Sequence, residues 1–377
     1  MATATIEELL QLLVERRGSD LHLSAGSPPR VRVDGNLVAT EHEVLKPDGV
    51  KRLIYSFLSG EQVARFEKEL EIDLSFGVEG LGRFRTNVFF QRGTVTAVLR
   101  MIPYQIRTFE ELGLPGKICD EICELPRGLV LVTGSTGSGK STTLAAMIDK
   151  INSERHDHIL TIEDPIEFIH PHKNCLVNQR EVHSDTASFS NALRAALRED
   201  PDIVLIGEMR DLETVEAAQK IAETGHLTFG TLHTNSAAQT INRIIDIFPA
   251  GQQAQIRTQL SLVLEGIVCQ ALLPRADGKG RVASLEILIP TPAIRNLIRD
   301  DKVHQIYGAM QTGQEKLGMQ TQNQSLASLY QKRLITLETA LSASSNKDEL
   351  QDMINRGVGV VEGAGLNQRP MVRPART

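Results

Sequence analysis

The stretch Gly134-Ser135-Thr136-Gly137-Ser138-Gly139-Lys140-Ser141 decides the fold class of this chain. It matches G-x-x-x-x-G-K-[ST], the phosphate-binding loop of P-loop NTPases. The apolar run 128–133 before it predicts a buried strand, and residues 142–148 after it predict a helix. Glycines let the backbone wrap a polyphosphate with its N–H groups pointing inward, and the start of the following helix adds partial positive charge. The sequence therefore predicts that the chain binds a nucleoside triphosphate.

The residue types within this loop have distinct expected roles. Lys140 would reach the β- and γ-phosphates, and the Ser141 hydroxyl would ligate Mg²⁺. A chance Gly/Ser loop is the alternative, but the flanking strand and helix both favour the functional reading. The predicted nucleotide-binding residues are Gly134, Ser135, Thr136, Gly137, Ser138, Gly139, Lys140, Ser141 and Thr142.

Composition limits the classes of partner. The 41 basic and 47 acidic residues give a net charge of −6, so the chain has no general affinity for polyanions. There is no Trp, and only 4% of residues are aromatic, so neither a base-stacking platform nor a basic binding surface is evident. A nucleic-acid translocase is therefore the less supported alternative, and no nucleic-acid partner is expected.

Cysteine content and hydropathy indicate a compartment. The four cysteines are too few and too scattered for a disulfide framework, which favours a reducing, cytoplasmic setting. Cys119 and Cys123 stand i,i+4 on a predicted helix, where a structural apolar role is favoured over metal binding. The longest mainly apolar run, Leu260–Leu273, is interrupted by Glu265 and is too short to cross a bilayer. No signal peptide is expected, and any membrane association would go through a partner.

Two textures divide the chain near residue 105. The first part alternates short helices with strands that suit an antiparallel sheet, whereas the second alternates apolar strands with helices, as in a parallel, doubly wound α/β sheet. The predicted organisation is a small α+β domain at 1–102, a linker at 103–116, an α/β domain at 117–290, helices at 291–345 and a flexible tail at 346–377.

Acidic residues follow two of the predicted parallel strands. Ligands of open α/β sheets bind beyond the carboxyl ends of the strands, so Glu163 and Glu208 are expected beside the nucleotide. Glu208 stands where a Walker-B acid is found and is assigned to Mg²⁺, through its water molecules. Glu163 is the candidate general base, with Asp164 and Glu167 as lesser candidates. Taken singly, an acidic residue after a strand is usually a helix cap, but the neighbouring phosphate loop favours catalysis.

Two histidines flank a further predicted strand, at 227–231. His226 precedes this strand and His233 follows it. Both are candidates for sensing the γ-phosphate, and a structural role is the alternative for each.

Two arginines share one face of the predicted strand 83–88. The two-residue period of a strand puts Arg83, Arg85 and Asn87 on one side and apolar residues on the other. This face is either a solvated edge or a source of arginine fingers for a triphosphate held by another chain. A finger supplied in trans is worth ~10³–10⁵ in rate and requires an oligomer.

With these residues assembled, the chain resembles secretion-superfamily ATPases, and specifically the PilT-type retraction ATPases of type IV pili. Coverage runs from about residue 5 to 345. The matching passages are GSTGSGKST (Gly134–Thr142), TIEDPIEF (Thr161–Phe168), IGEMRD (Ile206–Asp211), TGHLTFGTLHTNSA (Thr224–Ala237), SDLHLSAGSPP (Ser19–Pro29) and AIRNLIRD (Ala293–Asp300).

The resemblance implies a PAS-like N-terminal domain, a RecA-like ATPase core and a homohexameric ring. It implies ATP and Mg²⁺ as cofactors, with Arg83 and Arg85 as fingers at a neighbouring subunit's site. The implied function is a cytoplasmic motor that drives pilus retraction through an inner-membrane platform, without inserting into the membrane itself. An accessory paralogue of that motor and a nucleotide sensor without turnover remain alternatives.

One of the matching passages also predicts a local structure. Thr291 suits a helix N-cap, and Pro292 suits the first helical position. Residues 293–300 then form an ordinary amphipathic surface helix, and only the resemblance makes it a candidate contact element.

Overall fold

The structure is a computed structural model that describes residues 4–33, 35–102, 105–312 and 318–357. Contacts divide these residues into two compact units, of which the first takes in the described parts of Met1–Glu111, Cys119–Gly128 and Ser141–Thr231. The second takes in Leu112–Ile118, Leu129–Lys140 and the described part of Leu232–Thr377. Residues 103–104 of the predicted linker and 358–377 of the predicted tail lie outside the described residues.

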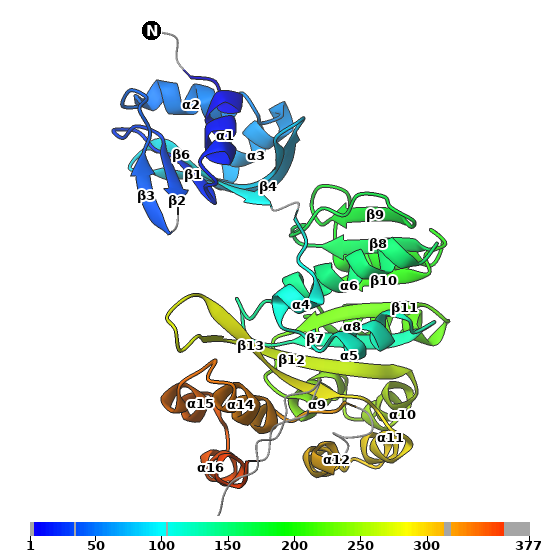
Figure 1. The fold of residues 1–377 in the computed structure, drawn as a ribbon. Coiled ribbons are helices and arrows are strands. Elements are labelled where there is room, and N and C mark those ends of the chain that lie inside the picture. Colours follow the sequence, from blue (N-terminus) through cyan, green and yellow to red (C-terminus); the bar gives the residue numbers. More distant parts are fainter. Residues whose placement is uncertain (1–3, 34, 103–104, 313–317, 358–377) are drawn as a thin grey trace, which may run out of the picture. The chain divides into compact units, whose positions relative to one another are not determined.

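The N-terminal residues form a six-stranded antiparallel sheet in the order β3-β2-β1-β6-β5-β4 (Figure 1). The strands are β1 (Asp20–Leu23), β2 (Arg30–Val33), β3 (Asn36–Ala39), β4 (Glu71–Val78), β5 (Gly82–Gln91) and β6 (Thr94–Ile102). The helices beside them are α1 (Ile6–Glu15), α2 (Pro47–Tyr55) and α3 (Gly60–Glu69).

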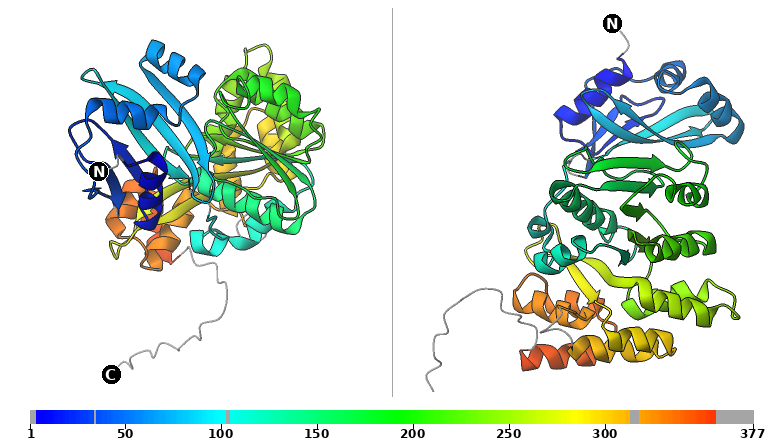
Figure 2. Two further views of the ribbon diagram at one scale, coloured as in Figure 1. Left: turned by 90° about the horizontal axis from the view of Figure 1, so that it is seen from above. Right: turned by 90° about the vertical axis from the view of Figure 1, so that its right-hand side faces the viewer.

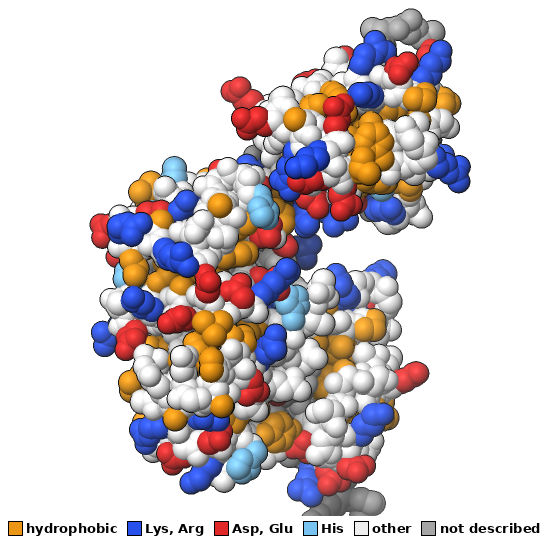
Figure 3. Space-filling model, turned by 180° about the vertical axis from the view of Figure 1, so that it is seen from behind, with side chains coloured by type: hydrophobic (Ala, Val, Ile, Leu, Met, Phe, Trp, Pro, Cys, Tyr) orange, Lys and Arg blue, Asp and Glu red, His pale blue; other side chains and the backbone are white. Residues whose placement is uncertain are grey.

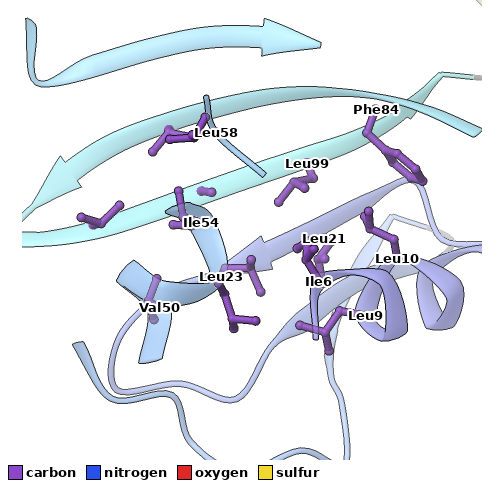
Figure 4. Close-up of a cluster of buried hydrophobic side chains, with 14 of the residues drawn as sticks. Ile6, Leu9, Leu10, Leu21, Leu23, Val50, Ile54, Leu58, Phe84 and Leu99 are labelled. Carbon is purple, nitrogen blue, oxygen red and sulfur yellow. The ribbon is translucent and has the colours of Figure 1, made fainter. Parts of the chain in front are cut away.

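Helix α1 shows how the sequence builds this part. The Thr5 hydroxyl accepts from the Glu8 N–H, and the Glu8 carboxylate accepts from the Thr5 N–H, which satisfies two backbone donors at the start of the helix. Its buried side chains recur at helical spacing and meet those of β1, β5, β6 and α2 in one apolar core (Figure 4). The labelled members are Ile6, Leu9, Leu10, Leu21, Leu23, Val50, Ile54, Leu58, Phe84 and Leu99.

The rest of the chain is built on a seven-stranded sheet in the order β13-β12-β7-β11-β10-β8-β9. The strands are β7 (Gly128–Thr133), β8 (His158–Glu163), β9 (Leu176–Glu181), β10 (Ile203–Ile206), β11 (Leu227–Leu232), β12 (Leu264–Pro274) and β13 (Arg281–Leu288). Strands β8, β10 and β11 run parallel, as predicted, and so do β7 and β12. Strand β9, which was not predicted, runs parallel to β8.

The far edge departs from the predicted parallel arrangement. Strands β12 and β13 pair antiparallel, with Ile267 opposite Leu288 and Pro274 opposite Arg281. Only six residues, 275–280, join them, and a parallel connection needs a crossover of a dozen or more residues. The sheet therefore ends in a hairpin.

Helices occupy the connections and the C-terminal part. They are α4 (Phe109–Leu112), α5 (Gly116–Cys123), α6 (Lys140–Glu154), α7 (Phe189–Ala196), α8 (Leu212–Glu223), α9 (Ala237–Asp246), α10 (Gln253–Val263), α11 (Pro292–Arg299), the 3₁₀ helix η1 (Val303–Gln305), α12 (Ile306–Thr312), α14 (Gln322–Gln331), α15 (Leu337–Ala343) and α16 (Lys347–Arg356). In both views of Figure 2, α14, α15 and α16 (orange to red) lie side by side.

Helix α16 falls where the sequence analysis expected a flexible tail from residue 346. Asn346 caps it by accepting from the Glu349 N–H, and Gly357, at φ 68°, ends it. Leu350 is fully buried in a small core with Leu326 and Ala340. The helix is strongly polar, so its position depends on this packing rather than on a sequence pattern.

Among the described residues, no helix has the length and hydropathy that a bilayer crossing requires.

Candidate nucleotide-binding and catalytic site

Two glycines of the loop between β7 and α6 lie close against Gln270 of β12. A Cβ at Gly134, where φ is 142°, would meet the Gln270 carbonyl oxygen at 2.2 Å and the Ser138 hydroxyl at 2.6 Å. At Gly139 φ is 92°, a conformation that side-chain-bearing residues rarely adopt, and a Cβ there would lie 2.8 Å from the side-chain nitrogen of Gln270. Both positions therefore require glycine, and the shape of the loop is set partly by its neighbouring strand.

Polar groups of the loop suit a bound polyphosphate. The Lys140 ammonium donates to the Gly134 and Ser135 carbonyl oxygens, at 2.9 and 3.1 Å, so it lies across the loop. The Ser138 hydroxyl is buried and has no hydrogen-bond partner within the described part of the chain. A buried hydroxyl is normally hydrogen-bonded. The loop thus offers a cation and an unsatisfied hydroxyl where the motif predicts phosphate.

Glu163 ends β8 and is held by three donors. Its Oε1 accepts from the Thr161 hydroxyl at 2.7 Å and from the Gln179 amide at 3.3 Å, and its Oε2 accepts from the Glu167 N–H at 3.3 Å. Burial raises the pKa of Glu163, against the opposing effect of these hydrogen bonds. A carboxylate with a raised pKa is better suited to take a proton near neutral pH.

Glu208 is brought close to Glu163 by Gly207. The Gly207 N–H donates to the Ile162 carbonyl at 2.8 Å, and a Cβ at Gly207 would lie 3.2 Å from the Cα of Glu163. The Glu208 carboxylate pairs with Arg210 at 2.5 Å. The two predicted acids therefore stand at neighbouring strand ends, because a glycine lets β10 end against β8.

The carboxyl end of β11 adjoins the same segment. The Thr231 hydroxyl donates to the Gly207 carbonyl at 2.6 Å, and the Met209 N–H donates to the Thr231 carbonyl at 3.0 Å. These bonds fix the chain around Glu208 from its second side.

The next residue of β11 contacts the phosphate loop. The Leu232 carbonyl accepts from the Gly134 N–H at 3.4 Å. His233 directly follows Leu232 in the sequence, so it is the neighbour of the residue that bonds the first glycine of the loop.

His226, by contrast, lies at the opposite end of β11. In the parallel pairing with β10, Leu227 stands opposite Ile203, so His226 precedes the strand. Six strand residues separate it from His233, a span of about 20 Å. Its Nδ1 contacts the Ile221 carbonyl at 3.0 Å and the Thr224 hydroxyl at 3.1 Å. The structure does not bring His226 to the acids, and its contacts are those of the structural alternative.

Arg83 and Arg85 lie on one face of β5, as the period predicts, but differ in their contacts. Arg85 is exposed. The Arg83 guanidinium donates to the Ser75 hydroxyl at 2.7 Å and pairs with the Glu181 carboxylate at 3.2 Å. Arg83 therefore has an acidic partner within its own chain.

Glu181, which ends β9, was missed by the sequence analysis. It is buried and accepts from the Ile166 N–H at 3.1 Å and from the Ser75 hydroxyl. Burial raises its pKa, but these hydrogen bonds and Arg83 together lower the pKa below the ordinary value. It is the last residue of β9, a polar strand that the sequence analysis did not predict, so no strand end pointed to it.

The two residues predicted to hold Mg²⁺ are Ser141 and Glu208. Ser141 stands in the first turn of α6, and Glu208 follows β10. The described residues hold no cluster of three or more His, Cys, Asp or Glu side chains that could bind a metal ion. All four cysteines are free and buried. A magnesium site here therefore needs phosphate oxygens to complete it.

A phosphate-binding loop between a strand and a helix, with acids after the neighbouring parallel strands, defines a P-loop NTPase. The family model described as "Type II/IV secretion system protein" matches residues 2–347. The chain belongs to this family, and it is an ATPase.

Individual relatives refine the likeness. The chain is 56% identical over 335 residues to the "Type IV pilus retractation ATPase PilT" of Pseudomonas aeruginosa, which covers 89% of this chain and 96% of that protein. It is 44% identical over 351 residues to the "Type IV pilus ATPase PilU" of the same organism, covering 93% and 91%. A solved structure of the "Pilus Retraction Motor PilT and Bound ADP" has 54% identity and a TM-score of 0.87, covering 93% of this chain and 100% of that one. The predicted fold class, with its RecA-like core and smaller N-terminal domain, is confirmed.

Proposed function

We propose that this chain is the ATP-hydrolysing motor that powers type IV pilus retraction. The observation that carries the proposal is the 56% identity with PilT over nearly the whole of that protein, together with an intact phosphate loop and both predicted acids. The lower identity with PilU, 44%, favours the motor over the accessory paralogue.

The phosphate loop is the proposed binding site for ATP. Lys140, the Ser138 hydroxyl and backbone N–H groups within 135–142 would hold the phosphates, while Gly134, whose own N–H donates to Leu232, would shape the loop around them. Ser141 with Glu208 would hold Mg²⁺, the latter through water. When bound, ATP supplies the phosphoryl group and Mg²⁺ supplies positive charge for its oxygens. The ADP named in the PilT structure supports a nucleotide at this loop.

Glu163 is the proposed general base. Its raised pKa and its place beside Gly207 suit a group that orients a water molecule and accepts its proton. Thr161 and Gln179 would orient the carboxylate through Oε1, while Oε2 accepts from the Glu167 N–H. His233 is the proposed sensor of bound phosphate, because Leu232 beside it touches the loop.

Arg85 is the stronger candidate for a finger acting on a neighbouring subunit. It is exposed, whereas Arg83 is engaged by Glu181 of its own chain. We therefore assign Arg85 as the arginine finger for the neighbouring subunit's site. Arg83 could act there only after its ion pair with Glu181 is released. A trans finger requires a ring or filament, and a homohexameric ring is the proposed closed form.

The proposed partner of the ring is the inner-membrane platform of the pilus machine. The ring itself is proposed to lie in the cytoplasm, where that platform holds it at the membrane. A nucleic acid is not proposed as substrate. On the face shown in Figure 3, Lys and Arg side chains are interspersed with Asp and Glu and form no continuous basic stripe.

Complementation tests the function. The chain is expected to restore twitching motility in a P. aeruginosa strain that lacks PilT, and Lys140→Ala is expected not to. Restoration only in a strain that lacks PilU would assign it to the accessory role. ATPase activity that rises with added DNA and falls steeply with salt would replace the proposal with a translocase.

A further inference from the structure

Three buried carboxylates lie outside the proposed catalytic groups among the described residues, namely Asp20, Glu181 and Glu286, and Glu286 is the one whose partners lie at helix starts. Glu286, in β13, is 3% exposed, and charged side chains are almost never fully buried without partners. It lies outside the phosphate loop and the other nucleotide-site motifs of the sequence. Its partners therefore have to explain its position.

Those partners are the first backbone N–H groups of two helices. Oε1 accepts from the Ala237 N–H of α9 at 2.7 Å, and Oε2 accepts from the Gln322 N–H of α14 at 3.4 Å. A helix N-terminus carries unsatisfied N–H groups and partial positive charge, so one carboxylate serves two such ends.

Each helix caps a later N–H group by itself. The Ser236 hydroxyl accepts from the Gln239 N–H at 3.2 Å, and the Thr321 hydroxyl accepts from the Gln324 N–H at 3.3 Å. Neither local cap reaches the first helical N–H. Glu286 is the group that completes both, and it thereby joins α9 to α14.

The segment before α9 carries His233 and is fastened to the first turn of that helix. The Thr234 and Thr240 hydroxyls hydrogen-bond at 2.7 Å, and the Asn235 N–H donates to the Gln239 side chain at 3.3 Å. A displacement of the start of α9 therefore moves the residues around His233.

On its other side, β13 is fastened to α14 by side chains. The Leu285 N–H donates to the Ser325 hydroxyl at 3.0 Å, and the Gln322 side chain donates to the Ser284 hydroxyl at 2.9 Å. Helix α14 packs in turn against α15 and α16. The C-terminal helices thus supply a fixed frame for Glu286.

We propose that Glu286 is a positioning residue, whose carboxylate fixes the start of α9 against α14 and so sets the placement of His233. The proposal rests on the function assigned to His233 above. It links the C-terminal helices to the ATPase reaction through one side chain.

The first test compares Glu286→Gln with Glu349→Gln in the full chain. Glu349 is the control carboxylate, because its hydrogen bonds within the described residues go to Tyr307, Gln311 and Asn323 and not to α9. Glu286→Gln is expected to lower kcat for ATP hydrolysis about tenfold, with KM changed less than about twofold, since a carboxylate bonded to two N–H groups is lost. Amide exchange of 234–240 is expected to accelerate in this variant alone. Unchanged exchange there would overturn the proposal.

A second pair of variants avoids altering the buried acid. Gln322→Pro removes the N–H that donates to Glu286 at a position where proline is well tolerated, and Gln322→Ala keeps that N–H. Both lose the bond from the Gln322 side chain to Ser284. Only Gln322→Pro is expected to accelerate exchange at 234–240 and to lower kcat. Equal behaviour of the two variants would count against the link between α14 and α9.

A double-mutant cycle with His233→Ala separates the two proposals. If Glu286 acts through His233, Glu286→Gln costs about twofold or less in kcat once His233 is replaced. A full additional tenfold loss would refute that route. If His233→Ala alone hydrolyses ATP like wild type, the role assigned to His233 fails, whereas the exchange measurements still decide whether Glu286 holds α9.

Discussion

Glu163 and Glu181 are the same residue type at paired positions, yet their environments drive them apart. They stand opposite each other in the register of β8 and β9. Burial raises the pKa of Glu163, whereas Glu181 gains Arg83 and enough hydrogen bonds for its pKa to fall. Divergent pKa values in neighbouring carboxylates are typical of a division of roles, here a base and a structural anion.

Replacing Glu163 with Gln is expected to keep ATP binding and to lower turnover by ~10²–10⁴, because a positioned base is lost. Binding is measured by titration with a fluorescent ATP analogue, and turnover by phosphate release. Glu167→Gln is the control, because Glu167 contributes its backbone N–H to Glu163. Full turnover in Glu163→Gln would remove Glu163 from the reaction.

The same substitution is expected to raise thermal stability at neutral pH. A raised pKa means that the folded state binds the proton more tightly than the unfolded state, so the stability due to Glu163 is present below about pH 4.3 and is lost as pH rises through the folded pKa. Glutamine does not titrate and escapes that loss. The gain in Tm over wild type should therefore shrink as pH falls toward 4, and a gain that grows in acid would contradict the assignment.

Arg83→Ala and Arg85→Ala are expected to fail in different ways. Removing Arg83 leaves the buried Glu181 carboxylate without its cation and should cost ~2 kcal/mol of folding stability. Arg85→Ala should unfold like wild type, since Arg85 is exposed, but lose ~10³ in turnover as a missing finger. Calorimetry and phosphate release measure the two effects, and wild-type hydrolysis by Arg85→Ala would end its assignment.

Among the elements, helix α11 carries Arg295, a motif residue whose contacts stabilise the fold. Thr291 caps this helix through the Ile294 N–H at 3.2 Å, and Pro292 takes the first helical position, as predicted. Arg295, however, turns inward. It donates to the Ser261 carbonyl at 2.9 Å and pairs with Glu265 at 2.9 Å.

Arg295→Ala is therefore expected to lower folding stability by ~1–3 kcal/mol, because several charge-assisted hydrogen bonds join α11 to the end of α10 and the start of β12. Arg299→Ala, on the exposed side of the same helix, should stay within about 0.5 kcal/mol of wild type. Chemical denaturation measures both. Equal stability of the two variants would show that Arg295 is a surface residue after all.

Elements whose pattern is local were predictable, and those that depend on distant partners were not. Strands β7, β8 and β10 were predictable because each is a short apolar run. Gly134 follows β7, Glu163 ends β8, and Gly207 and Glu208 follow β10. Helix α16 has few apolar residues, and its burial depends on α14 and α15. His226 lies away from the acids because a residue before a parallel strand stands at the edge of the sheet opposite the ligand, which its place beside a strand does not reveal without the strand's direction.

For the whole molecule, mixed assemblies test the proposed trans contact. Subunits with Lys140→Ala lack a working phosphate loop, and subunits with Arg85→Ala lack the finger, so each alone should be inactive. In mixtures, an intact loop meets an intact finger at some interfaces, and activity should recover to roughly a quarter of wild type or less. Native mass spectrometry should show a hexamer with ATP and Mg²⁺. A persistent monomer, or no recovery in mixed hexamers, would refute the trans site.

Only the part of the site that is encoded by local motifs could be predicted from the sequence, and the long-range pairings could not. The loop, Glu163 and Glu208 follow from motifs that are contiguous in the chain. Arg83 and Glu181 lie 98 residues apart, and Glu286 meets α9 across 49 residues, so their pairing follows from topology. No local pattern encodes such a meeting.

The Gln270 carbonyl oxygen, which a Cβ at Gly134 would meet at 2.2 Å, limits how the nucleotide site can evolve. Backbone oxygen atoms are present whatever side chain the neighbouring strand carries, so no compensating mutation on β12 can make room for a methyl group. Substitutions that change nucleotide affinity or the rate of hydrolysis are therefore expected outside this contact, while the backbone shape of the phosphate loop is inherited unchanged.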